Sequence, residues 1–168
     1  ERHIAYDIGA AEVSRRLSAM LDAPCVLAGY SRLLIDLNRP PGHPQSIMVA
    51  SDNTEIPGNF ALSDDAKGQR IRELFEPYHD AVNGALQRIW ENGAAPVLFS
   101  VHSFSPGFGD QPRPWDVGVL WNHDPRIAVP LMEILEDQGL NVGNNKPYSG
   151  HDLAYTIEEL QDLLPLSV

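Results

Sequence analysis

The sequence holds little of what several common protein classes need. Its 168 residues include a single cysteine, Cys25, which excludes an intramolecular disulfide framework and fits a reducing compartment. Only 12 lysines and arginines stand against 23 aspartates and glutamates, and the net charge of -11 argues against a nucleic-acid partner. No apolar run reaches the length of a membrane span, and the N-terminus lacks a signal-peptide pattern. We therefore expect a soluble, cytoplasmic protein that binds neither nucleic acid nor membrane; its oligomeric state is left open.

Common site motifs are absent as well. Without a Gly-x-Gly-x-x-Gly after a strand or a Walker-type loop, a nucleotide site has no support. Without Cys-x-x-Cys or His-Glu-x-x-His, a metal site must be assembled from distant positions. A small anionic substrate is still possible, because a few well-placed arginines can override the acidic field inside a cleft. The length suits one compact domain.

Helical and strand-like patterns alternate along the chain. Helices are predicted at 7–21, 69–90 and 126–138, with Pro77 expected to kink or break the second and Gly139 to end the third. Short apolar runs predict strands at 25–28, 33–37, 96–101, 117–121 and 140–142. Residues 45–68 read as a long irregular excursion, and 155–164 are ambiguous. This alternation predicts an α/β fold with a mixed, mostly parallel sheet in a three-layer sandwich.

Some side chains have a structural interpretation that competes with a functional one. Asp7 stands where an N-cap or first-turn acid of a helix would stand. Cys25 lies in an apolar run and is predicted to be buried, whereas His79 is expected on the surface of an amphipathic helix. The acidic group at Glu133, Glu136 and Asp137 is expected to be a solvated helix face.

Two polar stretches follow predicted strands. His102 comes at the exit of 96–101, where ligands of α/β sheets gather, although a satisfied core or loop histidine is an equal alternative. The stretch Asp36-Leu-Asn-Arg39 places Asn38 beside Arg39, a pair suited to binding a carboxylate through an amide and a bidentate guanidinium. Asp36 could instead close the strand end through a structural ion pair with an arginine.

A catalytic zinc needs three protein ligands and an open position for water. His102 could supply an imidazole and Asp7 a carboxylate, with His3 as a weaker third candidate. Glu158 or Glu159 could serve as a general base. One histidine and one carboxylate do not select among divalent metals.

Taken together, several stretches resemble the N-formylglutamate amidohydrolase family over nearly the whole chain. They are Ser31-Arg-Leu-Leu-Ile-Asp-Leu-Asn-Arg39, Ser51-Asp52, Ile56-Pro-Gly-Asn59, Pro77-Tyr-His79, His102-Ser-Phe-Ser-Pro106, Arg113-Pro-Trp115, Val117-Gly-Val-Leu-Trp-Asn122 and Asn145-Lys-Pro-Tyr-Ser-Gly150. The family is similar in turn to zinc carboxypeptidases and aspartoacylases. The resemblance implies zinc-dependent hydrolysis of the amide bond of an N-formyl, or small N-acyl, acidic amino acid such as N-formyl-L-glutamate.

The resemblance also implies roles for individual residues. His102 and Asp7 would ligate zinc; Asn38 and Arg39, assisted by Arg32, would hold the substrate carboxylate. Tyr148, in its Pro-Tyr-Ser-Gly loop, would close over the substrate. Glu158 falls on the position of the base.

The chain also departs from the family pattern. It begins without methionine after the strand that normally carries another histidine ligand, and a segment near the C-terminus is missing. It is therefore either the ordered part of a longer protein or a reduced paralogue without catalysis. The alternatives for function are a catalytically inactive carboxylate-binding module of the same fold, and a deacylase or carboxypeptidase acting on another acidic amide.

Overall fold

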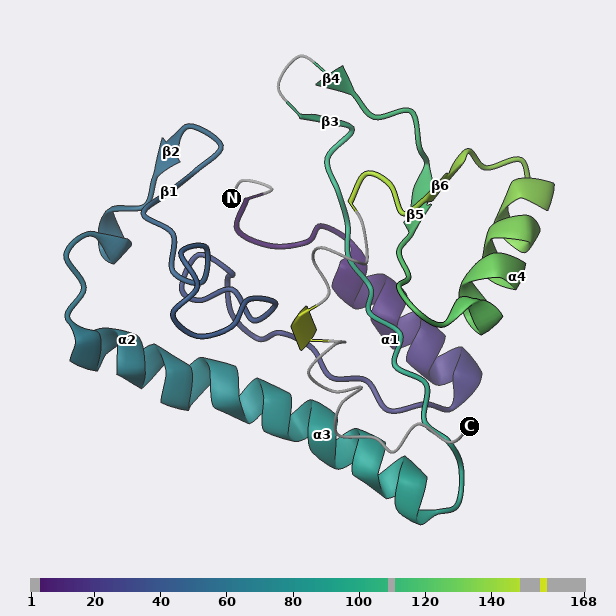
Figure 1. Ribbon diagram of the computed structural model, residues 1–168, viewed down its shortest axis with the longest axis horizontal. Coiled ribbons are helices and arrows are strands. Elements are labelled where there is room, and N and C mark those ends of the chain that lie inside the picture. The colour runs from purple at the N-terminus through teal and green to yellow at the C-terminus, as the bar shows by residue number, and fades with distance from the viewer. Residues whose placement is uncertain (1–3, 109–110, 149–154, 157–168) are drawn as a thin grey trace. The chain divides into compact units, whose positions relative to one another are not determined.

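The computed structural model describes residues 4–108, 111–148 and 155–156 (Figure 1). They divide into two compact units. The first contains the described residues up to Ser103 together with Tyr155 and Thr156, and the second contains those from Phe104 to Tyr148. A single domain over residues 1–168 stays a prediction.

The first unit is built around a long helical rod. Helix α2 (Asp64–Arg70), a π-helical turn (Ile71–Phe75) and α3 (Glu76–Glu91) follow one another without interruption (Figure 1). This confirms the helix predicted at 69–90. Pro77 was predicted to kink or break it, and the departure from α-helix is the π-helical turn just before Pro77, without a gap in the rod. Proline lacks the N–H that the interior of an α-helix requires. The turn before it is π-helical, with hydrogen bonds that span five residues in place of four, and Pro77 lies in the first turn of α3.

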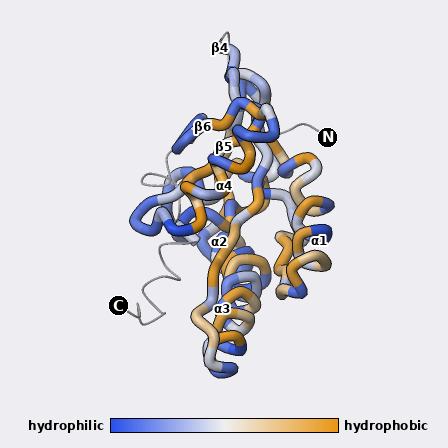
Figure 2. The backbone as a smooth tube through the Cα atoms, turned by 90° about the vertical axis from the view of Figure 1, so that its right-hand side faces the viewer, coloured by the Kyte–Doolittle hydropathy of each residue, from blue (hydrophilic) through white to orange (hydrophobic). Residues whose placement is uncertain are grey.

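One face of α3 carries the core of this unit. Val82 and Leu86 are buried against Val26, Tyr78 and Leu98. The hydropathy of the rod alternates around its axis, as an amphipathic helix requires (Figure 2).

The surface position predicted for His79 is wrong, because its side chain is buried. The ring stacks on Phe75 with centroids 4.1 Å apart, and Nδ1 donates a hydrogen bond to the Phe75 carbonyl at 3.0 Å. His79 lies four residues after the buried Phe75 and therefore on the same, buried face of the helical rod.

Helix α1 (Ala10–Leu21) begins three residues later than predicted. Its N-cap is Gly9, so the capping role proposed for Asp7 is wrong. The helical spacing of Val13, Leu17, Met20 and Leu21 predicted an apolar stripe, but no residue of α1 is buried: Met20 is 81% exposed and Leu21 70% exposed.

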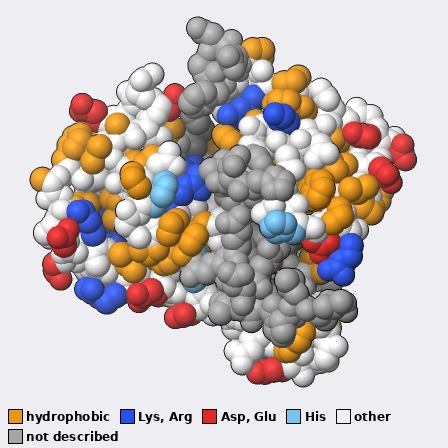
Figure 3. Space-filling model, viewed as in Figure 1, with side chains coloured by type: hydrophobic (Ala, Val, Ile, Leu, Met, Phe, Trp, Pro, Cys, Tyr) orange, Lys and Arg blue, Asp and Glu red, His pale blue; other side chains and the backbone are white. Residues whose placement is uncertain are grey.

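Several predicted strands do not form among the described residues. The stretches 25–28, 33–37 and 96–101 are extended or turn-like, and the strands of this unit are β1 (Ala50–Ser51) and β2 (Thr54–Glu55), an antiparallel hairpin within the predicted excursion. A 3-10 turn, Pro57–Asn59, follows them. Cys25, predicted to be buried, is exposed, as are Val97 and Phe99. Figure 3 shows hydrophobic side chains at the surface in several places. An apolar run favours burial, but a strand also needs a neighbour for its hydrogen bonds.

The second unit contains a parallel strand pair with a helix between its strands. Strand β5 (Val117–Val119) pairs with β6 (Val142–Asn144), and α4 (Pro125–Asp137) connects them. A separate antiparallel pair is formed by β3 (Gly107–Phe108) and β4 (Gln111–Pro112). The strand predicted at 117–121 is confirmed in its first half, whereas β6 begins where the predicted 140–142 strand ends.

Helix α4 lies within one residue of its predicted range and stops before Gly139, whose φ of +83° suits glycine. The helical spacing predicted that Ile127, Leu131, Ile134 and Leu135 face inward. Leu131 and Leu135 do pack, partly buried, against the core of Val119, Ala128 and Met132, whereas Ile127 and Ile134 are exposed. The acidic face Glu133, Glu136 and Asp137 is exposed as predicted.

The fold is α/β, as predicted. Each described sheet has two strands, so the three-layer sandwich stays a prediction. Among the described helices, none combines the length and the apolar character needed to span a membrane.

Candidate functional site

Two of the predicted metal ligands come together in the first unit. The Nδ1 atom of His102 lies 2.6 Å from Oδ2 of Asp7, although 95 positions separate the two residues. On the other side of the ring, Nε2 lies 3.1 Å from the hydroxyl of Ser100. In an extended segment, residues two apart point to the same side, so Ser100 could have been predicted from the sequence as the neighbour of the imidazole.

The surroundings of Asp7 favour its charged form. Partial burial alone would raise the pKa of Asp7, but the hydrogen bond and charge of His102, the backbone N–H of Ser103 and the charge of Arg32 together hold that pKa below its ordinary value of 3.8. Its side chain is 28% exposed, so solvent can reach the pair. The pair thus offers an anionic oxygen and an imidazole nitrogen at one point.

Backbone hydrogen bonds hold Arg32 beside this pair. The carbonyl of Ala5 accepts hydrogen bonds from the Ser31 hydroxyl at 2.8 Å and from the Arg32 amide at 3.2 Å. The Ser31 hydroxyl also accepts from the Leu33 amide at 3.2 Å. These hydrogen bonds join the segment before Asp7 to residues 31–33. They bring Arg32, predicted to assist in binding the substrate carboxylate, near the predicted metal ligand Asp7.

The segment that follows is a turn and not the predicted strand end. Arg32 forms an ion pair with Asp36 at 2.6 Å, and Asp36 is only 5% exposed. This confirms the structural ion pair that was predicted as an alternative. The second oxygen of Asp36 accepts the Asn38 amide at 3.0 Å, so the chain folds back through a side-chain-to-backbone turn.

Asn38 and Arg39 lie next to each other on this turn. Arg39 donates from Nη1 to the Asn38 carbonyl at 2.6 Å and from Nε to Gln45 at 3.3 Å. The amide of Thr156 donates to Oδ1 of Asn38 at 3.1 Å, and the Thr156 hydroxyl donates to the Leu37 carbonyl at 3.2 Å. Because a backbone N–H can only donate, the oxygen of the Asn38 carboxamide is identified, and its nitrogen is the donor end. Sequence analysis missed Thr156, because nothing local connects it to Asn38.

A buried amide fixes the start of the same segment. Asn59, 5% exposed, donates from Nδ2 to the carbonyls of Leu33 at 2.8 Å and Met48 at 2.6 Å. Its oxygen accepts from Arg70 at 2.7 Å, and the same Arg70 nitrogen donates to the Leu34 carbonyl at 2.7 Å. Helix α2 and the 57–59 turn thus hold the turn that carries Asp36 to Arg39.

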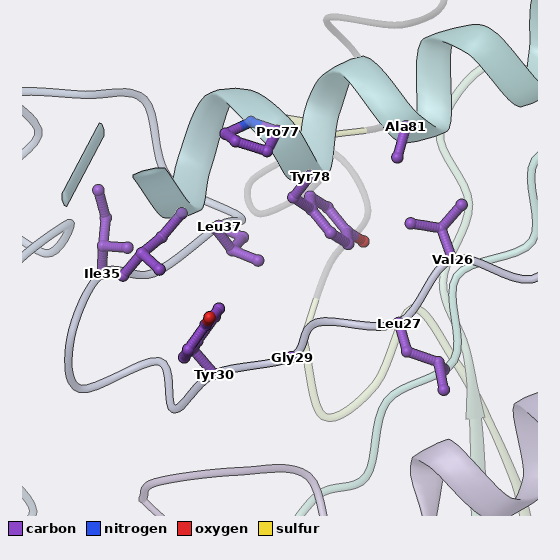
Figure 4. A pocket seen from close by; sticks show the side chains of 10 residues that line it. Val26, Leu27, Gly29, Tyr30, Ile35, Leu37, Pro77, Tyr78 and Ala81 are labelled. Atoms are coloured by element: carbon purple, nitrogen blue, oxygen red, sulfur yellow. The ribbon is translucent and has the colours of Figure 1, made fainter. Parts of the chain in front are cut away.

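Two cavities lie near these segments. One, of about 260 Å³, is lined mostly by apolar side chains between the 26–37 stretch and α3 (Figure 4). Burial, and secondarily the charge of Cys25, raises the pKa of the Tyr78 hydroxyl in its wall. This cavity shares Gly29 and Tyr30 with a second cleft, and neither Asp7 nor His102 lines either of them. The second cleft, of about 280 Å³, is lined by Ala5, Tyr6, Ala28, Gly29, Tyr30 and Ser31, next in the chain to Asp7 and Arg32.

Three further predicted site residues are not described as part of this arrangement. His3 and Glu158 lie outside the described residues. Among residues 4–108, 111–148 and 155–156, no three or more His, Cys, Asp or Glu side chains form a group that could hold a metal ion.

Tyr148 belongs to the second unit, where its hydroxyl accepts a hydrogen bond from Arg113 at 3.0 Å. The Arg113 guanidinium also lies 4.9 Å from the centre of the Tyr148 ring, within the range of a cation–π contact. A contact of Tyr148 with substrate stays a prediction.

Comparisons with known proteins identify a family and a similar solved structure. A search of curated proteins found no match. Among solved structures, the crystal structure of gene product Atu2144 from Agrobacterium tumefaciens matches with a TM-score of 0.86 and 32% sequence identity. The alignment covers 97% of this chain and 65% of that one. The family model for N-formylglutamate amidohydrolase matches residues 1–163. The chain therefore belongs to the N-formylglutamate amidohydrolase family.

Proposed function

We propose that this protein is a metal-dependent amidohydrolase that removes the formyl group, or a similar small acyl group, from an acidic N-acyl amino acid, with N-formyl-L-glutamate as the default substrate. The observation that supports the proposal is the Asp7–His102 pair at 2.6 Å, with Arg32 close enough for its charge to act on Asp7. Arg32 in turn forms an ion pair with Asp36, at the start of the turn that leads to Asn38 and Arg39. A ligand pair next to a carboxylate-binding pair is what hydrolysis of an acidic N-acyl amino acid requires.

Asp7 and His102 fit a zinc ion as two of its three protein ligands. A carboxylate oxygen and a neutral imidazole nitrogen are ordinary zinc ligands. To bind zinc, Oδ2 and Nδ1 would exchange the hydrogen bond that joins them for bonds to the metal. When bound, zinc would polarise the acyl carbonyl and lower the pKa of a bound water. Asp7 is suited to this role because its lowered pKa keeps it ionised at neutral pH.

The remaining residues would bind and orient the substrate. The Arg39 guanidinium and the amide nitrogen of Asn38 would donate to the substrate carboxylate, an acceptor-only group. Arg32, held by Asp36, would add positive charge between the two halves of the site. Glu158 would carry the proton to the leaving amine, and this role rests on the family resemblance.

The proposal is tested by replacing His102 with alanine and measuring two quantities on the same preparation: zinc per chain by elemental analysis, and formate release from N-formyl-L-glutamate. We expect both to fall together. His43→Ala is the matched control, because His43 is exposed and lies outside the pair, and it should change neither quantity.

Full hydrolysis by the His102→Ala variant would rule out the ligand assignment. A wild-type protein that binds N-formyl-L-glutamate without zinc and without hydrolysis would support the alternative, an inactive carboxylate-binding module. Hydrolysis of other acidic amides in preference to N-formyl-L-glutamate would support a deacylase or carboxypeptidase.

A further inference from the structure

The cleft of about 280 Å³ beside Asp7 is not explained by a formyl substrate. We propose that it is the acyl pocket of the site and that it accepts linear, uncharged acyl groups longer than formyl. This inference rests on the proposed function, since it concerns the acyl part of the same substrate.

The position of the cleft is the first argument. Its walls come from two segments, 5–6 and 28–31, and each segment continues directly into a residue of the site, Asp7 or Arg32. The Ala5 carbonyl accepts hydrogen bonds from Ser31 and Arg32, so the walls are fastened together at that end. The cleft therefore adjoins the backbone of the segments that carry Asp7 and Arg32, although neither Asp7 nor His102 lines it. In the proposal, the alkyl chain of a substrate bound at Asp7 and His102 extends into this cleft.

The size of the cleft is the second argument. The cleft has a volume of about 280 Å³. Measured in the same way, a single water molecule needs roughly 10–15 Å³. A formyl group carries only a hydrogen beyond its carbonyl carbon and would leave most of this space unfilled. An acyl chain of three or four carbons would remove more apolar surface from water.

The lining is the third argument. All the lining residues are uncharged, and three of them, Ala5, Ala28 and Gly29, have little or no side chain. A Cβ placed on Gly29 would meet no atom within 4 Å, so the space beside it is open. Tyr6 and Tyr30 supply rings as walls. The lining therefore offers no ionic partner to a charged group, while it exposes about as much polar as apolar surface.

The test is a homologous series of unreactive ligands. N-methylsulfonyl-, N-ethylsulfonyl- and N-propylsulfonyl-L-glutamate keep the carboxylates and lack a hydrolysable acyl bond, so their dissociation constants can be measured by calorimetry on active protein. Each added methylene that leaves water should tighten binding about fourfold, or roughly 16-fold from methyl to propyl. In parallel, kcat/KM is measured for N-formyl-, N-acetyl-, N-propionyl- and N-butyryl-L-glutamate.

Two variants fill the cleft. Ala28→Leu should reduce the preference for propyl over methyl at least tenfold, and Gly29→Leu should do so independently if the first variant folds poorly. Ala95→Leu is the matched control, because Ala95 is also an exposed alanine outside helices and strands and does not line the cleft. It should retain the wild-type preference.

The outcomes separate this inference from the proposed function. If N-formyl-L-glutamate is hydrolysed but the wild-type sulfonyl series is flat, or both filled variants keep the preference, the acyl pocket is refuted and the hydrolase stands. If the protein binds none of the sulfonyl ligands and releases no formate, the proposed function fails and the acyl pocket fails with it. The pocket is established if wild-type binding tightens from the methyl to the propyl ligand and this preference is lost in the cleft variants but kept in Ala95→Leu.

Discussion

The ion pair between Arg32 and Asp36 offers the sharpest test of how the site is held. Asp36 is nearly buried, whereas the Arg32 side chain is 43% exposed, so the pair lies between the exposed and the buried limits. Exposed pairs contribute about 0.2–1 kcal/mol, and loss of one partner of a buried pair costs about 3–5 kcal/mol. Because half-exposure screens the guanidinium, we expect a coupling free energy of about 1–2 kcal/mol.

The measurement is a double-mutant cycle with Arg32→Met, Asp36→Ala and the combined variant, each unfolded in urea at pH 7. The single change Arg32→Met should destabilise the protein by about 2 kcal/mol. It removes the guanidinium from the buried Asp36 carboxylate, whose remaining described partner is the backbone amide of Asn38. Repeating the cycle in 1 M salt should reduce the coupling only modestly, since one partner is buried. A coupling below about 0.3 kcal/mol would refute the argument and release Arg32 for a purely substrate-binding role.

Three further predictions concern single residues. Arg39→Lys should raise KM for N-formyl-L-glutamate about tenfold and weaken discrimination against its amide analogue, because a point charge cannot reproduce the fork; unchanged selectivity would contradict the role of Arg39. Because the pKa of Asp7 lies below 3.8 in the folded protein, its charged form stabilises the fold above that pH, and this contribution is lost as the pH falls through the lower folded-state pKa. The melting temperature of Asp7→Asn should therefore lie below that of wild type at pH 5 and approach it toward pH 2, and a difference that is constant with pH would oppose this. Asp124 caps α4, and its hydrogen bonds with Arg126 lower its pKa to about 2. Asp124→Ala should therefore lower the melting temperature, followed by circular dichroism, at pH 5 but hardly at pH 2. An equal loss at both pH values would exclude the charge of Asp124 as the cause.

Helices were predicted better than strands, and the reason is the range of the interactions. The rod through α3 and helix α4 were found from local signals, namely apolar spacing and, for α4, a glycine just after its end. The strands at 25–28 and 96–101 were predicted from apolar runs, yet they do not pair in the described structure. An apolar run states a preference for burial and does not specify a hydrogen-bonding neighbour.

The local sequence pattern also failed to predict which individual residues are buried. Cys25 was expected inside and lies outside, while His79 was expected on the surface and is buried on Phe75. A residue's type sets an average tendency for burial, whereas its actual exposure depends on which element packs over it. The face of α4 that is buried, with Ala128 and Met132, shows the same limit.

The residue types of the site and the family were determined by the sequence alone, because the motifs around Asp36 and His102 are carried by short stretches of chain. The tertiary structure decided which of these residues meet. It paired Asp7 with His102 across 95 positions and placed Thr156 on Asn38 across 118. It also turned Arg32 toward Asp36 and opened a cleft between residues 5–6 and 28–31. Contacts between distant segments depend on how the whole chain packs, since no local pattern specifies the partner of a side chain.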